Sequence, residues 1–193
     1  MKGLTEVYVS NIEPNGDVYV QIRSPGYERL MSLLSNLEKS MGQELQKKMD
    51  PTPRDDAELI YFVKHKNEQW YRVRIKEWAP NKVYVQLYFV DYGNCDIVKV
   101  CDTHMLPLDD LSDTAGQFPG QAVRVQMDID KIPNDFQIRA KEMMPKDQPM
   151  LIKVSKKVLI DGKYAIKGRF FKRTPLNRDL VSICDCINFE SEK

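Results

Sequence analysis

The stretch from Val83 to Asp91 divides into two sets of alternate positions, with tyrosine and glutamine in one set and aliphatic residues and phenylalanine in the other, and this period of two predicts a β-strand. Both faces of the strand carry apolar or aromatic side chains, so we expect it to be buried on both sides. The residues Asp91-Tyr92-Gly93-Asn94 follow it. Gly93 permits a positive φ and Asn94 tolerates one, which predicts a sharp turn. A returning strand is expected over residues 94–100.

Three further segments near this strand have the same alternation. They predict strands over residues 58–65 and 69–78 and a short closing element over residues 104–106, with a turn at Ala79-Pro80-Asn81. Short strands joined by tight turns, with almost no helix, indicate a small five-stranded barrel.

The chain on either side of the barrel predicts hairpins and helices. The first flank has strands over residues 6–11 and 17–23, and then a helix that Ser24 caps and that runs from Pro25 toward Met49. The second flank is expected to contain four elements: a strand over 121–127, a helix over 133–144, a hairpin over 150–171 and a last helix from Thr174-Pro175 through Ile187.

Neither flank could bury a core alone, because an isolated two-stranded hairpin is marginally stable in water. We therefore expect both flanks to form one domain that the barrel interrupts, an insertion that is tolerated where chain ends meet. The predicted division is residues 1–53 and 113–193 for the discontinuous domain and residues 55–112 for the barrel.

Composition limits the class of protein. Of 193 residues, 42% are hydrophobic and 30% charged, as in soluble globular proteins. The start, MKGLTEVYV, is no signal peptide, and no apolar run could span a bilayer, so no membrane partner is expected. The net charge of +1 argues against wholesale binding of nucleic acid. Residues 55–110 hold 10 acidic and 7 basic side chains, which suits a cationic ligand.

Metal binding and catalysis have weak support. The four cysteines are expected to be free thiols, and Cys95, Cys101 and His104 lack the spacing of a zinc site. No nucleophile, phosphate-binding loop or paired acid and base stands out. We expect a non-enzymatic chain with no metal, no cofactor and no small-molecule substrate.

Two motifs carry a resemblance to a known family. WYRVRI, which starts at Trp70, followed by VQLYFVDYGN, which ends at Asn94, closely resembles the core of a Tudor domain. Leu106-Pro107-Leu108 and the segment 118–123 resemble the junction that leaves the barrel in extended Tudor domains. The resemblance implies a mainly β fold with a few helices: a five-stranded Tudor barrel inserted into a discontinuous β-barrel of the OB or staphylococcal-nuclease type.

The resemblance also implies a site for symmetrically dimethylated arginine. The matching positions are Tyr71, Phe89 and Tyr92 as three rings of an aromatic cage and Asn94 as a polar acceptor. The fourth ring falls at His65, a departure from the family pattern, and Tyr61 or Phe62 would take its place if the alignment slips. Plain core packing of the three rings is the alternative, and His65 as an exposed strand end is another.

Four residues are expected to support the site rather than to touch a ligand. Trp70 points away from Tyr71 and should lie in the core. Asp91 should position the turn, by pairing with Arg72, and Gly93 should allow its sharp bend.

Single-stranded RNA is the rival ligand, because basic side chains gather on the second hairpin and OB-type barrels bind single strands in basic grooves. These candidates are Lys153, Lys156, Lys157, Lys163, Lys167 and Arg169. This hypothesis predicts steep salt dependence and loss of binding when Lys156 and Lys157 are replaced.

As for function, the resemblance implies a scaffold that binds the arginine-rich N-terminal tail of a Piwi-clade Argonaute. It places the protein in the germline piRNA pathway that silences transposons, in cytoplasmic, perinuclear germ granules. The alternative within the family is a scaffold whose cage is incomplete at His65 and which binds its partner whether or not arginine is methylated.

Overall fold

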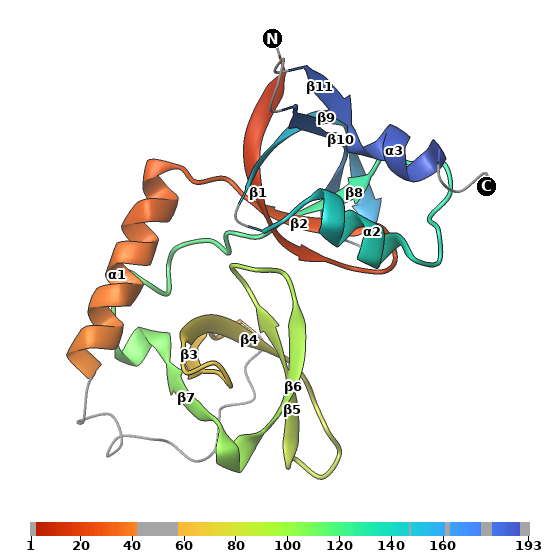
Figure 1. The fold of residues 1–193 in the computed structure, drawn as a ribbon. Helices are drawn as coiled ribbons and strands as arrows, with labels where there is room; N and C mark the ends of the chain where they lie inside the picture. Colours follow the sequence, from red (N-terminus) through yellow and green to blue (C-terminus); the bar gives the residue numbers. More distant parts are fainter. Residues whose placement is uncertain (1–2, 42–57, 147, 161–162, 175–178, 190–193) are drawn as a thin grey trace. The chain divides into compact units, whose positions relative to one another are not determined.

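The computed structural model describes residues 3–41, 58–146, 148–160, 163–174 and 179–189. The chain forms two compact units (Figure 1). Unit 1 combines Met1–Arg23 with Ala122–Lys193, and unit 2 is the continuous segment Ser24–Gln121. Two distant segments of the chain thus share one unit, as expected from the weakness of each flank.

Unit 2 is built on a curved sheet of five antiparallel strands in the order β6-β5-β4-β3-β7. The strands are β3 (Tyr61–Lys64), β4 (Trp70–Trp78), β5 (Tyr84–Phe89), β6 (Cys95–Lys99) and β7 (His104–Pro107). Their inward side chains, among them Val63, Val73 and Leu87, form one buried cluster. Two short 3-10 turns, Val100–Asp102 and Leu108–Asp110, flank β7.

Strand β5 is buried on one face only, so the expectation of burial on both faces is wrong. Val85, Leu87 and Phe89 point inward and are fully buried, whereas Tyr84 on the other face is 45% exposed. The outward side chains are mostly tyrosine, whose polar tip is compatible with a surface position.

Helix α1 (Pro25–Met41) belongs to unit 2. Ser24 caps it as predicted, because the Ser24 hydroxyl accepts a hydrogen bond from the N–H of Tyr27 at 3.3 Å. The helix packs Leu30 and Leu34 against the barrel residues Phe62, Leu106 and Leu108. The predicted extension toward Met49 lies outside the described residues. The predicted segment borders at 53/55 and 112/113 stay a prediction.

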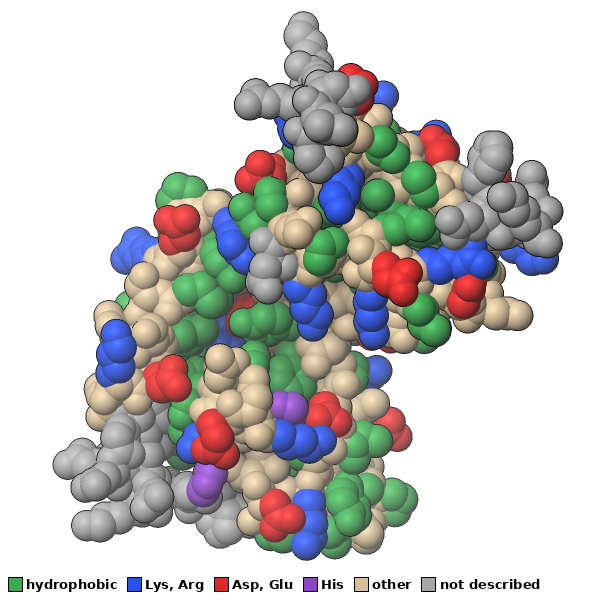
Figure 2. All heavy atoms as spheres, viewed as in Figure 1, with side chains coloured by type: hydrophobic (Ala, Val, Ile, Leu, Met, Phe, Trp, Pro, Cys, Tyr) green, Lys and Arg blue, Asp and Glu red, His purple; other side chains and the backbone are tan. Residues whose placement is uncertain are grey.

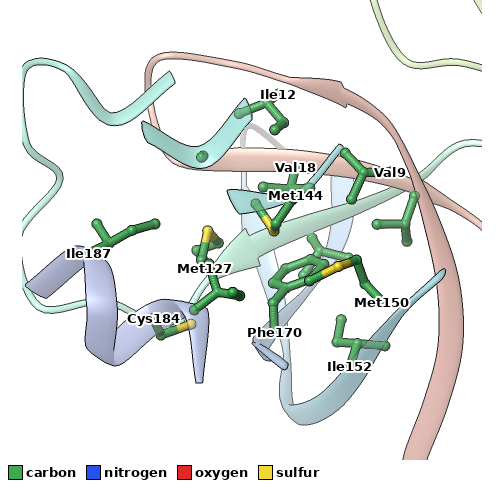
Figure 3. Close-up of a cluster of buried hydrophobic side chains, with 14 of the residues drawn as sticks. Val9, Ile12, Val18, Met127, Met144, Met150, Ile152, Phe170, Cys184 and Ile187 are labelled. Atoms are coloured by element: carbon green, nitrogen blue, oxygen red, sulfur yellow. The ribbon is translucent and has the colours of Figure 1, made fainter. Parts of the chain in front are cut away.

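Unit 1 is a closed ring of strands. Its sheet has the order β11-β10-β8-β2-β1-β9, and β9 pairs back to β10, so five strands close on themselves. The elements are β1 (Leu4–Ile12), β2 (Asp17–Gln21), β8 (Val123–Met127), β9 (Pro149–Ile160), β10 (Lys163–Arg173) and β11 (Leu180–Ser182), with helices α2 (Phe136–Met143) and α3 (Ile183–Phe189). Figure 3 shows the core of this unit, where Phe170, Met150 and Met127 pack together.

The last helix begins later than predicted. Leu180 lies in β11, which pairs with the end of β10 through Phe171 and Ser182, and α3 starts at Ile183. Pairing with β10 therefore outweighs the helical spacing of the apolar residues that the sequence offers. Among the described residues, no helix combines the length and apolarity needed to cross a bilayer.

Candidate functional site

Four aromatic rings gather at one end of the unit 2 barrel. The Tyr71 ring lies 5.4 Å from that of Phe89 and 5.3 Å from that of Tyr92, centroid to centroid, and both pairs are edge to face. The His65 ring lies 5.2 Å from Phe89 and 6.0 Å from Tyr71, again edge to face. The predicted ring positions are thus brought together, and His65 completes the group.

The bend after β5 places two of these rings. The Phe89 carbonyl accepts hydrogen bonds from the N–H groups of Tyr92 and Gly93, at 3.1 and 2.8 Å, and the Phe89 N–H donates to the Asn94 carbonyl at 3.0 Å. Gly93 has a φ of +86°, which glycine adopts without strain. The chain therefore reverses within four residues, and Phe89 and Tyr92 reach the same side.

The turn between β3 and β4 places the other two rings. The His65 carbonyl accepts a hydrogen bond from the Glu68 N–H and the His65 N–H donates to the Gln69 carbonyl, both at 2.9 Å. The Tyr71 hydroxyl accepts from the Asn67 side chain at 2.7 Å and donates to the Gln69 side chain at 2.8 Å. Asn67 and Gln69 thus hold Tyr71, a role that sequence reasoning missed.

His65 is held from strand β6. Its Nε2 lies 2.9 Å from Oδ2 of Asp96, and Lys66 Nζ lies 2.9 Å from the same oxygen. Burial would raise the pKa of the Asp96 carboxyl, but hydrogen bonds from Lys66, His65 and the Ile97 N–H outweigh it and hold that pKa below its usual value. Asp96 was also missed, because nothing in the local pattern of β6 indicates a partner on the β3–β4 turn.

The alternative fourth rings lie elsewhere. Tyr61 and Phe62 are both 1% exposed. Tyr61 points into the barrel core, and Phe62 stacks on Trp70 with centroids 4.9 Å apart. Trp70 is thus part of the packing beneath α1, as predicted, and faces away from Tyr71.

The ring cluster is graded from buried to exposed. Phe89 is 1% exposed at its base, while Tyr71, Tyr92 and Asn94 are half-buried, and the His65 side chain is 19% exposed. Tyr71 and Tyr92 thus reach the surface, where ring faces can attract a weakly hydrated cation through their quadrupoles. His65 also lines a separate hollow of about 330 Å³ with Lys99, Asp102 and His104, and the other three rings are not among its walls.

Arg72 and Asp91, each next to a ring residue in the sequence, form the predicted ion pair. Arg72 Nε and Nη2 donate to the two Asp91 oxygens at 2.9 and 2.6 Å, and both side chains are buried. Arg72 also donates to the carbonyls of Ala115, Phe118 and Pro119. This pair joins β4, the turn after β5 and the segment that leaves the barrel.

The basic hairpin of unit 1 is partly neutralised. Lys167 Nζ lies 3.0 Å from Asp128, and Arg169 pairs with Asp185. Lys153, Lys156 and Lys157 are exposed, whereas the Lys163 side chain is outside the described residues. Figure 2 shows acidic and basic side chains interspersed over the face it draws.

One aromatic side chain of this hairpin, Phe170, is not available for base stacking. Phe170 is fully buried in the core, so its ring is closed to a base (Figure 3). RNA binding by the hairpin therefore stays a prediction. Within the described part of the chain, no three histidine, cysteine or carboxylate side chains are placed to hold a metal ion.

The sequence of this chain is similar to those of known proteins. The profile of the Tudor domain family matches residues 2–129. Human Tudor domain-containing protein 6 is 35% identical over 100 residues, which cover 49% of this chain but only 4% of that protein. The Tudor and KH domain-containing protein homolog of Drosophila melanogaster is 28% identical over 113 residues, 55% of this chain and 20% of that protein. The chain thus spans a small part of the curated relatives it matches.

Solved structures share the architecture of this chain. The extended Tudor domain of Drosophila melanogaster Papi, in complex with a symmetrically dimethylated Piwi N-terminal peptide, superposes with a TM-score of 0.78 at 20% identity over 97% of each chain. The same domain with the unmethylated peptide gives a TM-score of 0.75 at 21% identity, again over 97% of each chain. The predicted fold, a Tudor barrel within a discontinuous second β-barrel, is confirmed. The family match also supports a non-catalytic module. The chain belongs to the Tudor domain family.

Proposed function

We propose that this chain binds a peptide through an arginine, preferentially symmetrically dimethylated, whose cationic head enters the cluster of His65, Tyr71, Phe89 and Tyr92. The observation that carries the proposal is the mutual edge-to-face contact of these four rings at one end of the barrel. Methylation leaves the charge of guanidinium but removes N–H donors, so aromatic faces suit it better than water does.

The charge of the site's surroundings supports the same ligand. The ionised carboxylate of Asp96 lies next to the His65 ring. Asn94 is half-buried at the turn, and its side-chain amide oxygen can accept a hydrogen bond from an N–H that remains on a methylated guanidinium. A metal or a phosphate would need a different set of groups. The partner we propose is an arginine-rich tail of a Piwi-clade Argonaute, because the Papi domain of the same fold is known with Piwi peptides. The cellular setting would be piRNA-pathway granules.

Titration of labelled peptides tests the proposal. Arginine-rich peptides with unmodified or symmetrically dimethylated arginine are titrated against the wild-type chain by fluorescence anisotropy. We expect dimethylation to tighten binding by roughly threefold or more, in line with modest cation–π energies at partly exposed sites. Equal affinity for both peptides would contradict a methyl-selective site.

Two variants connect the binding to the rings. Tyr92→Leu removes a half-buried ring of the cluster, and we expect it to weaken binding at least about tenfold. Tyr84→Leu removes an exposed tyrosine from the outer face of β5 and serves as the matched control. Circular dichroism confirms that each variant is folded. Equal effects of the two substitutions would show that the cluster is not the site.

A methylation-independent scaffold is the second candidate, and the histidine in the fourth position favours it. An imidazole is smaller and more polar than a phenyl ring, so it offers dimethylated arginine less apolar contact. This candidate predicts that both peptides bind with the same affinity and that Tyr92→Leu still weakens both. If Tyr92→Leu weakens the binding of neither peptide, this candidate is excluded as well.

A further inference from the structure

The contact between His65 and Asp96 joins two elements that are not neighbours in the sheet. His65 follows β3, whereas Asp96 lies in β6, which β5 and β4 separate from β3 in the strand order. Their side chains nevertheless meet at 2.9 Å, between His65 Nε2 and Asp96 Oδ2. The His65 ring therefore has the aromatic cluster on one side and a carboxylate on its edge.

The carboxylate itself is fixed. Its Oδ2 also accepts from Lys66 at 2.9 Å, and its Oδ1 accepts from the Ile97 backbone N–H at 2.8 Å. The resulting network keeps the carboxyl ionised, which the lowered pKa of Asp96 reflects. An anchored anion of this kind can hold a neighbouring ring in one orientation.

The chemistry of the contact determines where the histidine proton lies. An ionised carboxylate only accepts hydrogen bonds, so Nε2 of His65 must carry a proton. In the neutral ring, Nδ1 is then unprotonated. A fixed tautomer and a fixed ring plane are what an aromatic wall needs if it is to contact a cation repeatedly in one geometry.

The same contact offsets the weakness of histidine as a wall. A neutral imidazole offers a cation less than an indole or phenol face, and a protonated one repels it. A hydrogen bond from Nε2 to a carboxylate shifts electron density into the ring and so strengthens the attraction of the ring face for a cation. Lys66 pairs with the same carboxylate and opposes its direct attraction for the ligand, so the effect on the ring is the one we assign to Asp96.

We propose that Asp96 is a positioning residue of the cation site: it fixes the Nε2–H tautomer of His65 and thereby allows the imidazole to act as the fourth ring that contacts the cation. The proposal rests on the cation-binding function proposed above. The proposal explains how the site binds a cation although its fourth ring is the imidazole of His65 and not a phenyl or phenol ring. It also assigns a role to Asp96, which lies outside the Tudor motif.

A double-mutant cycle tests the dependence of Asp96 on His65. Affinity for the symmetrically dimethylated peptide is measured for wild type, Asp96→Ala, His65→Phe and the double variant. We expect Asp96→Ala to weaken binding about fivefold to tenfold in the wild-type background and less than about twofold in the His65→Phe background, since a phenyl ring needs no hydrogen-bond partner. A similar loss in both backgrounds would mean that Asp96 acts by charge alone and would overturn the proposal.

Asp102→Ala is the matched control. Asp102 lines the same cavity as His65 but pairs with Lys99, and its side chain is largely exposed. Its removal deletes the same charge without touching the ring, so we expect less than about a twofold change in affinity because exposed charges are strongly screened. An effect as large as that of Asp96→Ala would overturn the positioning role.

Nitrogen NMR of the imidazoles provides a readout that needs no peptide. The chain has two histidines, so the His65→Phe spectrum assigns the remaining signal to His104. We expect the His65 signals of the wild type to report an Nε2–H tautomer, and Asp96→Ala to return the ring to a mixture. An unchanged tautomer in Asp96→Ala would overturn the proposal even if affinity falls.

The proposed function and the proposed role of Asp96 can fail separately. If the wild type does not bind the peptide, or Tyr92→Leu leaves binding intact, the proposed function falls and this inference with it. If Tyr92→Leu abolishes binding while Asp96→Ala leaves it unchanged, the cation site stands and only the role of Asp96 is wrong.

Discussion

Arg72 and Asp91 form a two-bond ion pair in which both side chains are buried, 19 residues apart in the sequence. Arg72 also donates hydrogen bonds to three backbone carbonyls of the segment that leaves the barrel. Asp91 Oδ1 in turn accepts the backbone N–H of Gln121 at 3.0 Å. The pair thus ties the turn that carries Tyr92 to the end of unit 2.

Removal of one member of the Arg72–Asp91 pair should strongly destabilise the fold. Arg72→Met leaves the Asp91 carboxylate buried without its cation, and we expect unfolding in urea to show a loss of about 3–5 kcal/mol. Glu58→Ala is the control within the same unit, because the Glu58–Arg74 pair is exposed and should contribute less than about 1 kcal/mol. A loss of similar size in both variants would contradict the role we assign to Arg72.

Gly120 is required for a close approach of two backbone segments. A Cβ at this position would lie 2.7 Å from the Val90 carbonyl oxygen, which is backbone and cannot swing away. We expect Gly120→Ala to cost roughly 1–3 kcal/mol in thermal or urea unfolding, the usual range for overpacking.

Gly26→Ala is the matched control for that substitution. A Cβ on Gly26, in the first turn of α1, would meet only the Ser24 hydroxyl at 3.6 Å. Alanine favours helix more than glycine does, so stability should stay unchanged or rise slightly. If Gly26→Ala is destabilised while Gly120→Ala keeps the stability of the wild type, our assignment of the close approach to Gly120 is wrong.

The sequence predicts best what lies within one motif or on neighbouring strands. The reversal at Gly93 and the shared side of Phe89 and Tyr92 follow from a short motif, and the structure agrees with the predicted pairing of Arg72 with Asp91. Contacts between distant strands were not predictable in this way. The Asp96–His65 contact depends on how the five strands curve toward one another, which alternation of apolar positions does not encode.

The error at the C-terminal end has a similar cause. Apolar residues between Leu180 and Ile187 fit helical spacing, but Leu180 pairs with Arg173 of β10 and therefore lies in a strand. Burial of β5 was overestimated because aromatic residues were counted as core. Tyr84, which is 45% exposed, shows that a tyrosine can occupy the outer face of a barrel.

The cysteines should differ in reactivity according to burial. Cys184 is fully buried in the core of unit 1, and burial raises the pKa of its thiol. Cys95 and Cys101 are exposed. We expect iodoacetamide to label Cys95 and Cys101 in the native protein at least about 100-fold faster than Cys184, since Cys184 reacts only through opening of the fold. Peptide mass spectrometry over a time course measures each rate, and comparable rates would contradict the packing of α3.

The histidine wall should limit the preference for methylated arginine. His65 contacts Phe89 and Tyr71 edge to face, but its imidazole carries two polar ring atoms where a phenyl ring would present carbon to the methyl groups. In His65→Phe we expect the ratio of affinities for dimethylated over unmodified peptide to rise about threefold to tenfold, mainly through tighter binding of the methylated form. Anisotropy titration of both peptides gives the ratio. His104→Phe, a change of the same kind outside the ring cluster, should leave it unaltered. An unaltered ratio in His65→Phe would mean that this position does not touch the methyl groups, and that the selectivity of the site depends on the other three rings.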